Sequence, residues 1–258
     1  MRSLGTLMTS TRVISIVATV LLASTAHGEA AVPKPFSATY AVSYRGISAG
    51  TITFTFSHDP ATGHYTYETH PNPGALARLF VSSAAVERSV MQIDDSGTRP
   101  IEWQLDDGKS SKAKDGELHF DWSRNSVTGT IEGEPVNLTA EPGTQDRSSI
   151  QIAVTTALLR GVDPGTIALI DDNRIKRYVY TKKEQATVDS TLGKLDTVIY
   201  ESTREGGSSR TSRFWMAPSL EYLPVRAEQI RKGKVETVMV LEKLEVTATG
   251  SSEPNAPR

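Results

Sequence analysis

The sequence predicts a mainly β protein, built as one large curved antiparallel sheet or an open β-barrel with one helix against its concave side. Three observations lead to this class. Apolar and polar residues alternate with a period of two along most of the chain, which is typical of strands with one buried face. Short runs rich in Gly, Asp and Asn separate these segments, as hairpin turns do. One segment departs from this period and follows helical spacing instead.

The first residues have the features of a secretory signal peptide. Arg2 and Arg12 precede an uncharged apolar run at 13–24, and small residues follow it. The run is about a dozen residues long, shorter than the roughly 20 that a membrane-spanning helix needs. We therefore expect a signal peptide at 1–26, cleaved near Ala26 or Ala30, a mature chain without a transmembrane segment, and a location in the periplasm of a Gram-negative bacterium.

Residues 36–138 predict an antiparallel meander. Every second residue of 36–44 is apolar or aromatic, and 52–56 repeats the pattern. Gly46 and Gly50 between them mark a tight connection or a bulge. A turn at 59–63 returns the chain into an aromatic strand. Further short strands are expected at 86–90, 101–105, 118–122 and 127–131.

A helix is predicted at 147–160. Apolar residues recur there at i, i+4, i+7 and i+8, the spacing of a single helical face: Ile150, Val154, Ala157 and Leu158. Asp146 or Ser148 can cap its first turn, and Gly161 can end it.

Residues 165–245 predict a second group of strands. They are expected at 166–170, 175–181, 186–191, 195–202, 211–216, 225–230 and 235–244, with turn residues between them. We expect residues 27–248 to form a single β-rich domain, in which 36–138 and 165–245 are possible sub-sheets joined by the helix. The polar, proline-containing segment 249–258 predicts a disordered tail.

The composition excludes several classes of function. The chain of 258 residues has no Cys, which rules out disulfides, a thiolate nucleophile and Cys-ligated zinc or iron–sulfur sites. A net charge of −2 offers no basic field for nucleic acid. Loss of residues 1–26 would remove two arginines and no acid and change this charge to −4. No phosphate-binding glycine loop is present, and we expect neither a cofactor nor a metal.

Five segments carry a family resemblance through their order and spacing. They are 40–46 with the following Gly50, 145–149 at the start of the predicted helix, 191–197, 214–218 and 222–226. Together they resemble the domain of unknown function 3108 family over nearly all of the mature chain. The resemblance implies a periplasmic, β-rich bacterial protein and no activity. The helix departs from the family pattern, because Gln151, Thr155 and Thr156 stand in a segment where that pattern is aromatic or rich in Leu. Structural positions of the family pattern are Gly46, Gly50, Asp146, Gly193, Arg213, Pro224 and Arg226.

No catalytic constellation is evident in the sequence. A serine nucleophile would need an elbow or a helical Ser-x-x-Lys motif, and neither occurs. Paired acids such as Asp106 and Asp107 stand at predicted turns, where Asp bonds the local backbone. The turn at 59–63 could place His58 opposite His64 as two ligands of a metal, although a solvent-facing hairpin end is the simpler interpretation. His27 would become an N-terminal copper ligand only if cleavage follows Ala26.

Aromatic residues on the predicted strands are the candidates for ligand binding. A curved sheet could line a cavity with them, or they could form a packed core. The candidates are Tyr40, Tyr44, Phe54, Trp103, Trp122 and Trp215. Asp146, Arg213 and Arg226 form a separate, charged set. They could make a structural pair between the helix start and the sheet, or could contact an anionic headgroup.

These observations favour a non-enzymatic periplasmic protein. We expect its concave β-surface to bind a hydrophobic or amphipathic ligand, such as a lipid, or a partner protein in envelope biogenesis. One alternative is a hydrolase acting on envelope polysaccharide, which rests on the acidic turns and the aromatic face. Another is a purely structural or assembly factor.

Overall fold

The computed structural model describes residues 31–247. The predicted signal peptide at 1–26, both expected cleavage sites and the predicted tail at 249–258 lie outside these residues. Within the described part of the chain, no helix is long and apolar enough to cross a membrane.

Within residues 31–247, fourteen strands form one antiparallel sheet that is not closed, with one α-helix, which confirms the predicted fold class. The strands of the first half are β1 Phe36–Tyr44, β2 Ile47–Asp59, β3 His64–Pro73, β4 Val86–Asp94, β5 Gly97–Asp106, β6 Gly116–Asp121, β7 Ser126–Ile131 and β8 Glu134–Thr139. Those of the second half are β9 Thr166–Asp171, β10 Arg174–Ser190, β11 Gly193–Arg204, β12 Arg210–Ala217, β13 Leu223–Arg231 and β14 Lys234–Val246. The helices are α1 Ser149–Leu159 and the 3₁₀ turns η1 Ala77–Leu79 and η2 Pro218–Leu220.

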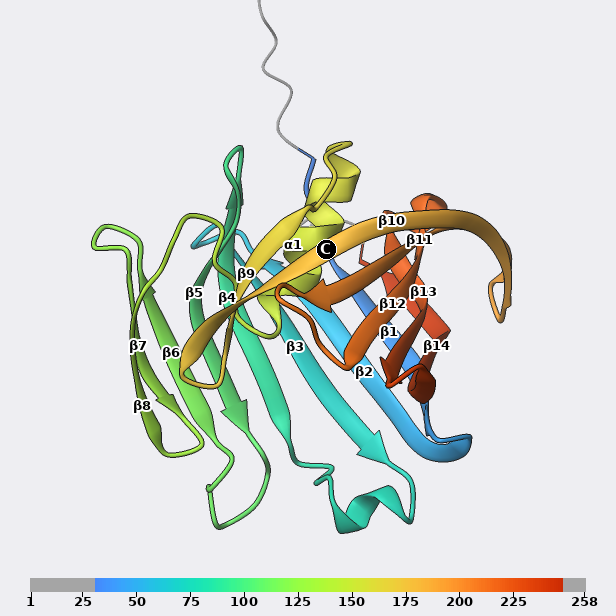
Figure 1. Ribbon diagram of the computed structural model, residues 1–258, viewed down its shortest axis with the longest axis horizontal. Helices are drawn as coiled ribbons and strands as arrows, with labels where there is room; N and C mark the ends of the chain where they lie inside the picture. Colours follow the sequence, from blue (N-terminus) through green and yellow to red (C-terminus); the bar gives the residue numbers. More distant parts are fainter. Residues whose placement is uncertain (1–30, 248–258) are drawn as a thin grey trace, which may run out of the picture.

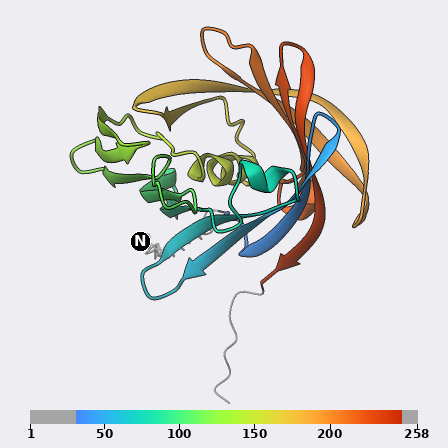
Figure 2. The ribbon, with the colours of Figure 1, turned by 90° about the horizontal axis from the view of Figure 1, so that it is seen from below.

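The strand order is β8 to β1, followed by β14 to β9. The two groups of strands that the sequence separates therefore join along β1 and β14, whose register runs from Phe36 opposite Val246 to Tyr44 opposite Thr237. The sheet edges are β8 and β9, and the chain passes from one to the other through α1. Figures 1 and 2 show the sheet curling around this helix, which lies on the concave side.

The strand directions place the turns at two opposite rims of the curled sheet. The turns β1–β2, β3–β4, β5–β6 and β13–β14 lie at one rim, which we call the η1 rim because the β3–β4 connection contains η1. This rim faces the viewer in Figure 2. The turns β2–β3, β4–β5, β6–β7 and β10–β11 lie at the opposite rim, together with the start of β1.

Helix α1 is shorter than the predicted 147–160 and is buried on more than one side. Ile150, Val154 and Leu158 pack against strands of the second half, as the spacing predicts. Ile152, however, points into the core beneath β1 and β2. The prediction of a single apolar face is therefore wrong, because a sheet that surrounds the helix also buries polar positions such as Thr155. Gly161 has a φ of +69° and ends the helix as predicted.

Two strands predicted separately, 175–181 and 186–191, are one 17-residue strand, β10. The charged residues between them do not interrupt it, because the pairing with β11 shifts register between Lys182 and Gln185 and absorbs the irregularity. The resulting β10–β11 hairpin reaches β14. The hydroxyl of Thr191 in its turn donates a 2.7 Å hydrogen bond to the carbonyl of Glu242.

Gly50 permits the close approach of β2 and β3. Its φ is +107°, and a Cβ on it would lie 2.3 Å from the carbonyl oxygen of Asn72. The adjoining β1–β2 turn consists of Arg45 and Gly46, both with positive φ. The pairing of β1 with β2 shifts register opposite Gly50. The tight turn at Gly46 and the register shift at Gly50 match the two alternatives that the sequence predicts, a tight connection and a bulge.

Candidate binding cavity

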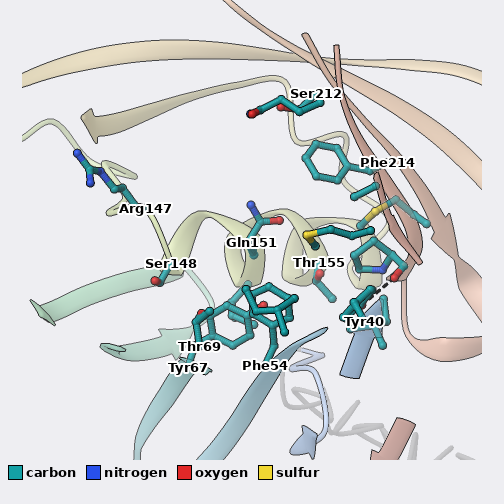
Figure 3. A pocket seen from close by; sticks show the side chains of 18 of the residues that line it. Tyr40, Phe54, Tyr67, Thr69, Arg147, Ser148, Gln151, Thr155, Ser212 and Phe214 are labelled. Carbon is teal, nitrogen blue, oxygen red and sulfur yellow. Dashed lines mark hydrogen bonds between the residues drawn. The ribbon is translucent and has the colours of Figure 1, made fainter. Parts of the chain in front are cut away.

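A cavity of about 360 Å³ lies between α1 and the concave face of the sheet. Its volume falls within the range of about 300–1,000 Å³ that is usual for small-molecule pockets. In Figure 3, Gln151 projects from α1 on the side of Phe214, whereas Phe54 and Tyr67 are drawn below the helix; all four line the cavity. The cavity is thus enclosed by the helix and by strands from both halves of the chain.

The lining changes from apolar to polar along the strands. Phe36, Met216 and Leu223 line the end that lies deepest and are buried. Ser212, Gln229 and Thr237 line the other end; Gln229 is exposed and the other two are half-buried. These three residues stand close to the β11–β12 and β13–β14 turns. The mouth of the cavity therefore faces the η1 rim.

A second, smaller cavity of about 140 Å³ lies beyond the apolar end of the first. Phe36, Thr155 and Leu223 line both cavities and so separate them. The side chain of Phe36 also packs against Phe56, with the ring centroids 5.8 Å apart. These three side chains form a partition within the curled sheet.

Two tyrosines supply polar atoms to an otherwise apolar wall. The hydroxyl of Tyr40 donates a 2.7 Å hydrogen bond to the carbonyl of Pro224. Burial raises the pKa of Tyr40 and of Tyr67 well above the ordinary value for a phenol. Both rings are neutral at physiological pH, so this wall carries no charge.

The start of α1 is built around the buried carboxylate of Asp146. It accepts 2.8 Å hydrogen bonds from the backbone N–H groups of Ser148 and Ser149. It also accepts a 2.7 Å bond from the hydroxyl of Ser89 on β4. Burial raises the pKa of Asp146 to about 6, although all these hydrogen bonds favour the ionised form. Of the two predicted caps, Asp146 supplies the side-chain bonds and Ser148 makes none to the helix.

The charged residues that line the cavity are Glu87, Arg147 and Glu228. The guanidinium of Arg147 lies 5.7 Å from the ring centroid of Trp103 and 3.5 Å from carboxylate oxygens of Asp171 and Asp172. Glu87 accepts a 2.9 Å hydrogen bond from the indole N–H of Trp103. Trp103 thus orients one cation and one anion at the cavity wall.

The structure brings only part of the predicted ligand set together. Tyr40 and Phe54 line the cavity. Trp103 is buried in a separate core between β5–β8 and β9, and Trp122 packs against the same core. Tyr44 is exposed at the end of β1.

Trp215 lies on the convex face of the sheet. Its neighbours Phe214 and Met216 line the cavity, and side chains alternate between the faces of a strand. The ring of Trp215 is flanked by the guanidinium groups of Arg213 and Arg226, at 5.9 and 5.4 Å from its centroid. Its place outside the cavity follows from this alternation.

The cavity residues that sequence reasoning missed come from three sources. Tyr67 follows the β2–β3 turn, and its aromatic alternation was the available signal. Phe214 is the neighbour of Trp215 on β12. The sequence analysis named a residue of the correct strand, but Trp215 lies on the face opposite the cavity. Gln151 stood out in the sequence only as a departure from the family pattern and did not indicate a cavity, because a polar helical residue is ordinarily solvent-facing.

Asp146, Arg213 and Arg226 do not form the structural pair that the sequence analysis considered. Arg213 donates to Glu201, and Arg226 donates to Glu228. Asp146 connects the helix start to the sheet through Ser89 instead. The pairing of Asp146 with either arginine is therefore wrong, because alternation puts both arginines on the convex face and the helix on the concave face.

The remaining family-pattern positions have backbone roles. Gly193 has a φ of +101° where β11 leaves its turn. The carbonyl of Pro224 on β13 accepts the hydrogen bond from Tyr40. Pro224 lines the cavity, whereas Gly193 stands at the β10–β11 turn outside the cavity lining.

Potential metal ligands are placed differently from the sequence expectation. His58 lies opposite Tyr65, and their rings stack with centroids 4.5 Å apart, whereas His64 lies opposite Asp59. The proposed histidine pair is therefore wrong, because the hairpin register differs by one residue. Each of the two side chains faces a different partner across the hairpin.

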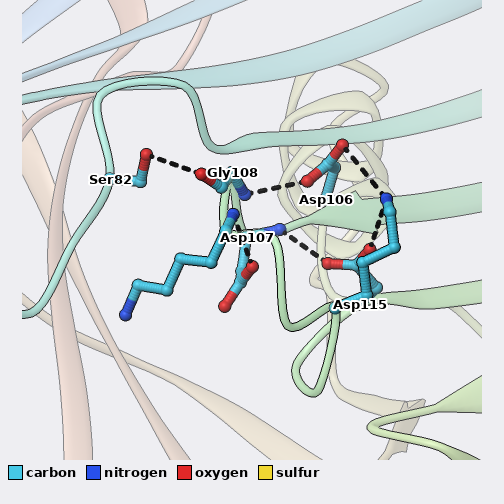
Figure 4. A network of polar contacts seen from close by, with 7 residues as sticks. Ser82, Asp106, Asp107, Gly108 and Asp115 are labelled. Atoms are coloured by element: carbon cyan, nitrogen blue, oxygen red, sulfur yellow. Dashed lines mark hydrogen bonds and ion pairs between the residues drawn. The ribbon is translucent and has the colours of Figure 1, made fainter.

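Three carboxylates come together in the β5–β6 connection, as Figure 4 shows: Asp106, Asp107 and Asp115. The ammonium of Lys112 lies 3.2 Å from Asp115 and 4.0 Å from Asp106. The backbone N–H of Asp107, followed by Lys112, lowers the pKa of Asp115. Hydrogen bonds within the loop and a lysine account for this cluster, and the acids lie away from the cavity lining.

The family model described as Protein of unknown function (DUF3108) matches residues 39–240. No curated protein matches the chain in sequence. Among solved structures, a β-barrel-like protein of the domain of unknown function DUF1849 from Brucella abortus is 13% identical, with a TM-score of 0.52. The alignment covers 84% of this chain and 99% of that one. This likeness supports the β-barrel-like architecture alone.

Two further solved structures are more distant. A predicted lipoprotein from Parabacteroides distasonis is 10% identical, with a TM-score of 0.34, over 83% of this chain and 97% of that one. A predicted exported protein with a YmcC-like fold from Bacteroides fragilis is 9% identical, with a TM-score of 0.33, over 84% of this chain and 100% of that one.

Proposed function

The chain belongs to the DUF3108 family of proteins of unknown function, and we propose that this member is a binding protein for an amphipathic molecule. The apolar part of the ligand occupies the cavity between α1 and the concave sheet. Its polar part stays at the mouth, toward the η1 rim. The proposed role is binding without catalysis.

The gradient in the cavity lining is the observation that carries this proposal. The deep end is apolar and buried, with Phe36, Met216 and Leu223. The mouth offers the hydrogen-bonding side chains of Ser212, Gln229 and Thr237. A ligand with one apolar and one polar end would satisfy both regions, whereas a sugar would leave its hydroxyl groups facing the apolar end without partners.

The expected location is the periplasm, where such a protein could carry a lipid or present it to an envelope partner. Support for this location is the sequence of the N-terminal segment, with Arg2 and Arg12 before the apolar run at 13–24. Mass determination of the protein purified from the periplasmic fraction tests it, since cleavage near Ala26 or Ala30 shortens the chain by a defined mass.

The binding proposal is tested with delipidated protein and a fluorescent fatty acid. Gln151 projects from α1 into the cavity (Figure 3), so Gln151→Trp should fill it and abolish saturable uptake of the probe. Gln92→Trp is the matched control. Gln92 is exposed on β4 beside the fully buried Met91, so its side chain lies on the convex face and the same substitution there should leave uptake unchanged.

Native mass spectrometry of the same proteins provides the second measurement. The unmodified protein and the Gln92→Trp variant should retain a co-purified amphipathic molecule that the Gln151→Trp variant lacks. Equal uptake by both variants would place binding outside the cavity. Absence of saturable uptake by the unmodified protein would refute the proposed function.

A further inference from the structure

The β3–β4 connection exposes an apolar surface at the η1 rim. Leu76, Leu79 and Phe80 are 67%, 74% and 77% exposed. They stand at i, i+3 and i+4 around the 3₁₀ turn η1, so they share one side of it. Val81 continues this exposed surface. An apolar surface at a loop tip is costly in water and marks a site of interaction.

The connection is fixed at both of its ends. The backbone N–H of Gly74 donates to the carbonyl of Ala49, and the guanidinium of Arg78 donates to the carbonyl of Pro73. The hydroxyl of Ser82 donates to the carbonyl of Gly108 in the neighbouring β5–β6 loop. The fold therefore holds the apolar side chains outward instead of leaving them on a loose segment.

Basic side chains surround this apolar surface. The turns adjoining it along the rim are 44–47, 107–115 and 231–236, and with 74–85 they form one continuous sector. Eight basic residues lie in the sector: Arg45, Arg78, Lys109, Lys112, Lys114, Arg231, Lys232 and Lys234. Four acids accompany them: Asp106 at the end of β5, Asp107, Asp115 and Glu236. This excess of positive charge contrasts with the net charge of −2 on the whole chain.

The acids in this sector are already engaged. Glu236 forms an ion pair with Arg45, and Asp115 forms one with Lys112. Asp107 accepts a hydrogen bond from the backbone N–H of Lys109. Further apolar side chains, Ile47 and Val235, are exposed at the adjacent turns. The sector thus combines protruding apolar groups with basic groups that have no acid of their own to neutralise them.

We propose that this sector of the η1 rim docks on the surface of an anionic lipid bilayer. Leu76, Leu79 and Phe80 enter the headgroup region, and the surrounding lysines and arginines contact lipid phosphates. Apolar insertion and electrostatic attraction to anionic lipids act together in this mode of binding. The proposal does not depend on what the cavity holds, although docking in this orientation would turn the mouth of the cavity toward the bilayer.

Vesicle flotation tests the proposal. Proteins purified from the periplasm, so that all carry the same N-terminus, are mixed with phosphatidylcholine vesicles with or without phosphatidylglycerol. The unmodified protein should float with the anionic vesicles and not with the neutral ones. The double variant Leu79→Asp/Phe80→Asp should reduce the floated fraction about tenfold or more, because it removes both inserted side chains.

The matched control is Leu192→Asp, at the tip of the β10–β11 turn on the opposite rim. Leu192 is also an exposed leucine in a turn, and its replacement should leave flotation unchanged. The charge contribution is tested with Lys232→Glu/Lys234→Glu, which should weaken flotation. Raising the salt concentration should weaken it as well, because salt screens exposed charges. Circular dichroism and thermal unfolding establish that each variant is folded.

Three results would overturn the proposal. The first is flotation of the Leu79→Asp/Phe80→Asp variant at the level of the unmodified protein. The second is equal binding of the unmodified protein to neutral and anionic vesicles, or binding to neither. The third is a dimer of the unmodified protein in solution that becomes a monomer in the double variant, since this would identify the apolar surface as a contact between two copies of the chain.

Discussion

The hydroxyl of Ser89 on β4 donates a 2.7 Å hydrogen bond to the carboxylate of Asp146, and both side chains are fully buried. The same carboxylate accepts the first free N–H groups of α1. This pair therefore fixes the start of the helix at one place on the concave face. Because the helix forms one wall of the cavity, this buried acid helps to set the position of that wall.

Replacement of Asp146 by Asn tests the charge of this acid. Its pKa of about 6 in the folded protein lies above the ordinary value of 3.8, so the folded state binds the proton more tightly between these two pH values. The contribution of Asp146 to stability therefore falls as the pH rises from about 4 to about 6. Urea unfolding should show the free energy of unfolding of Asp146→Asn rising relative to the unmodified protein by about 2 kcal/mol from about pH 4 to about pH 7.

The control for this prediction is Asp121→Asn. Asp121 ends β6 beside the β6–β7 turn, its side chain is 44% exposed, and hydrogen bonds from Ser123 are the main cause of its lowered pKa. Its contribution to stability is therefore present above its ordinary pKa and lost as the pH falls, and its removal should change the pH dependence in the opposite direction. The same sign for both variants would contradict the assignment of Asp146 as a buried, proton-binding group.

Gly50→Ala should destabilise the protein much more than Gly46→Ala. An added Cβ at Gly50 would lie 2.3 Å from the carbonyl of Asn72, whereas at Gly46 it would meet open space. Both positions have positive φ, so Gly46→Ala should cost only the backbone penalty of about 1 kcal/mol. Gly50→Ala should exceed this by at least about 2 kcal/mol in urea unfolding, because β2 and β3 must move apart.

Phe36→Ala should join the two cavities. Phe36 lies in the partition between them, so its truncation lengthens the apolar space available to a ligand. The variant should lose about 3–5 kcal/mol of stability and bind longer fatty acids in preference to those that the unmodified protein prefers. Phe120→Ala is the control, since Phe120 is similarly buried in the separate core and lines neither cavity. An unchanged chain-length preference in Phe36→Ala would show that ligands do not reach the partition.

Arg226→Met should be more destabilising than Arg213→Met. Both guanidinium groups flank Trp215, but their carboxylate partners differ. Glu228 is 9% exposed and has Arg226 as its ion-pair partner, so Arg226→Met leaves a buried charge and should cost about 1–3 kcal/mol. Glu201 is more exposed and keeps Lys183 at 3.3 Å after loss of Arg213. Equal unfolding free energies for the two variants would indicate that stacking on Trp215 outweighs the ion pairs.

The sequence predicted turns, the end of the helix and the faces of single strands, because these features depend on residues that are neighbours along the chain. The turn at Arg45 and Gly46 and the helix end at Gly161 depend on backbone conformations that Gly adopts easily. The strand faces of Phe36 and Tyr40 follow from alternation within one strand. The register of β2 with β3 could not be predicted in this way. A shift of one residue changes the partner of His58 but leaves the same residues in both strands.

The sequence by itself determined the β class, the single helix among the described residues and the family, because period-two alternation, helical spacing and motif order are properties of the chain. Only the tertiary structure decided which strands meet, which face of each strand looks inward, and where the two rims lie. Both faces of the sheet bury aromatic residues, so Phe54 and Trp215 look alike in sequence, although one lines the cavity and the other lies outside it. Pairing of β1 with β14 curls the sheet around α1, and this long-range contact creates the cavity.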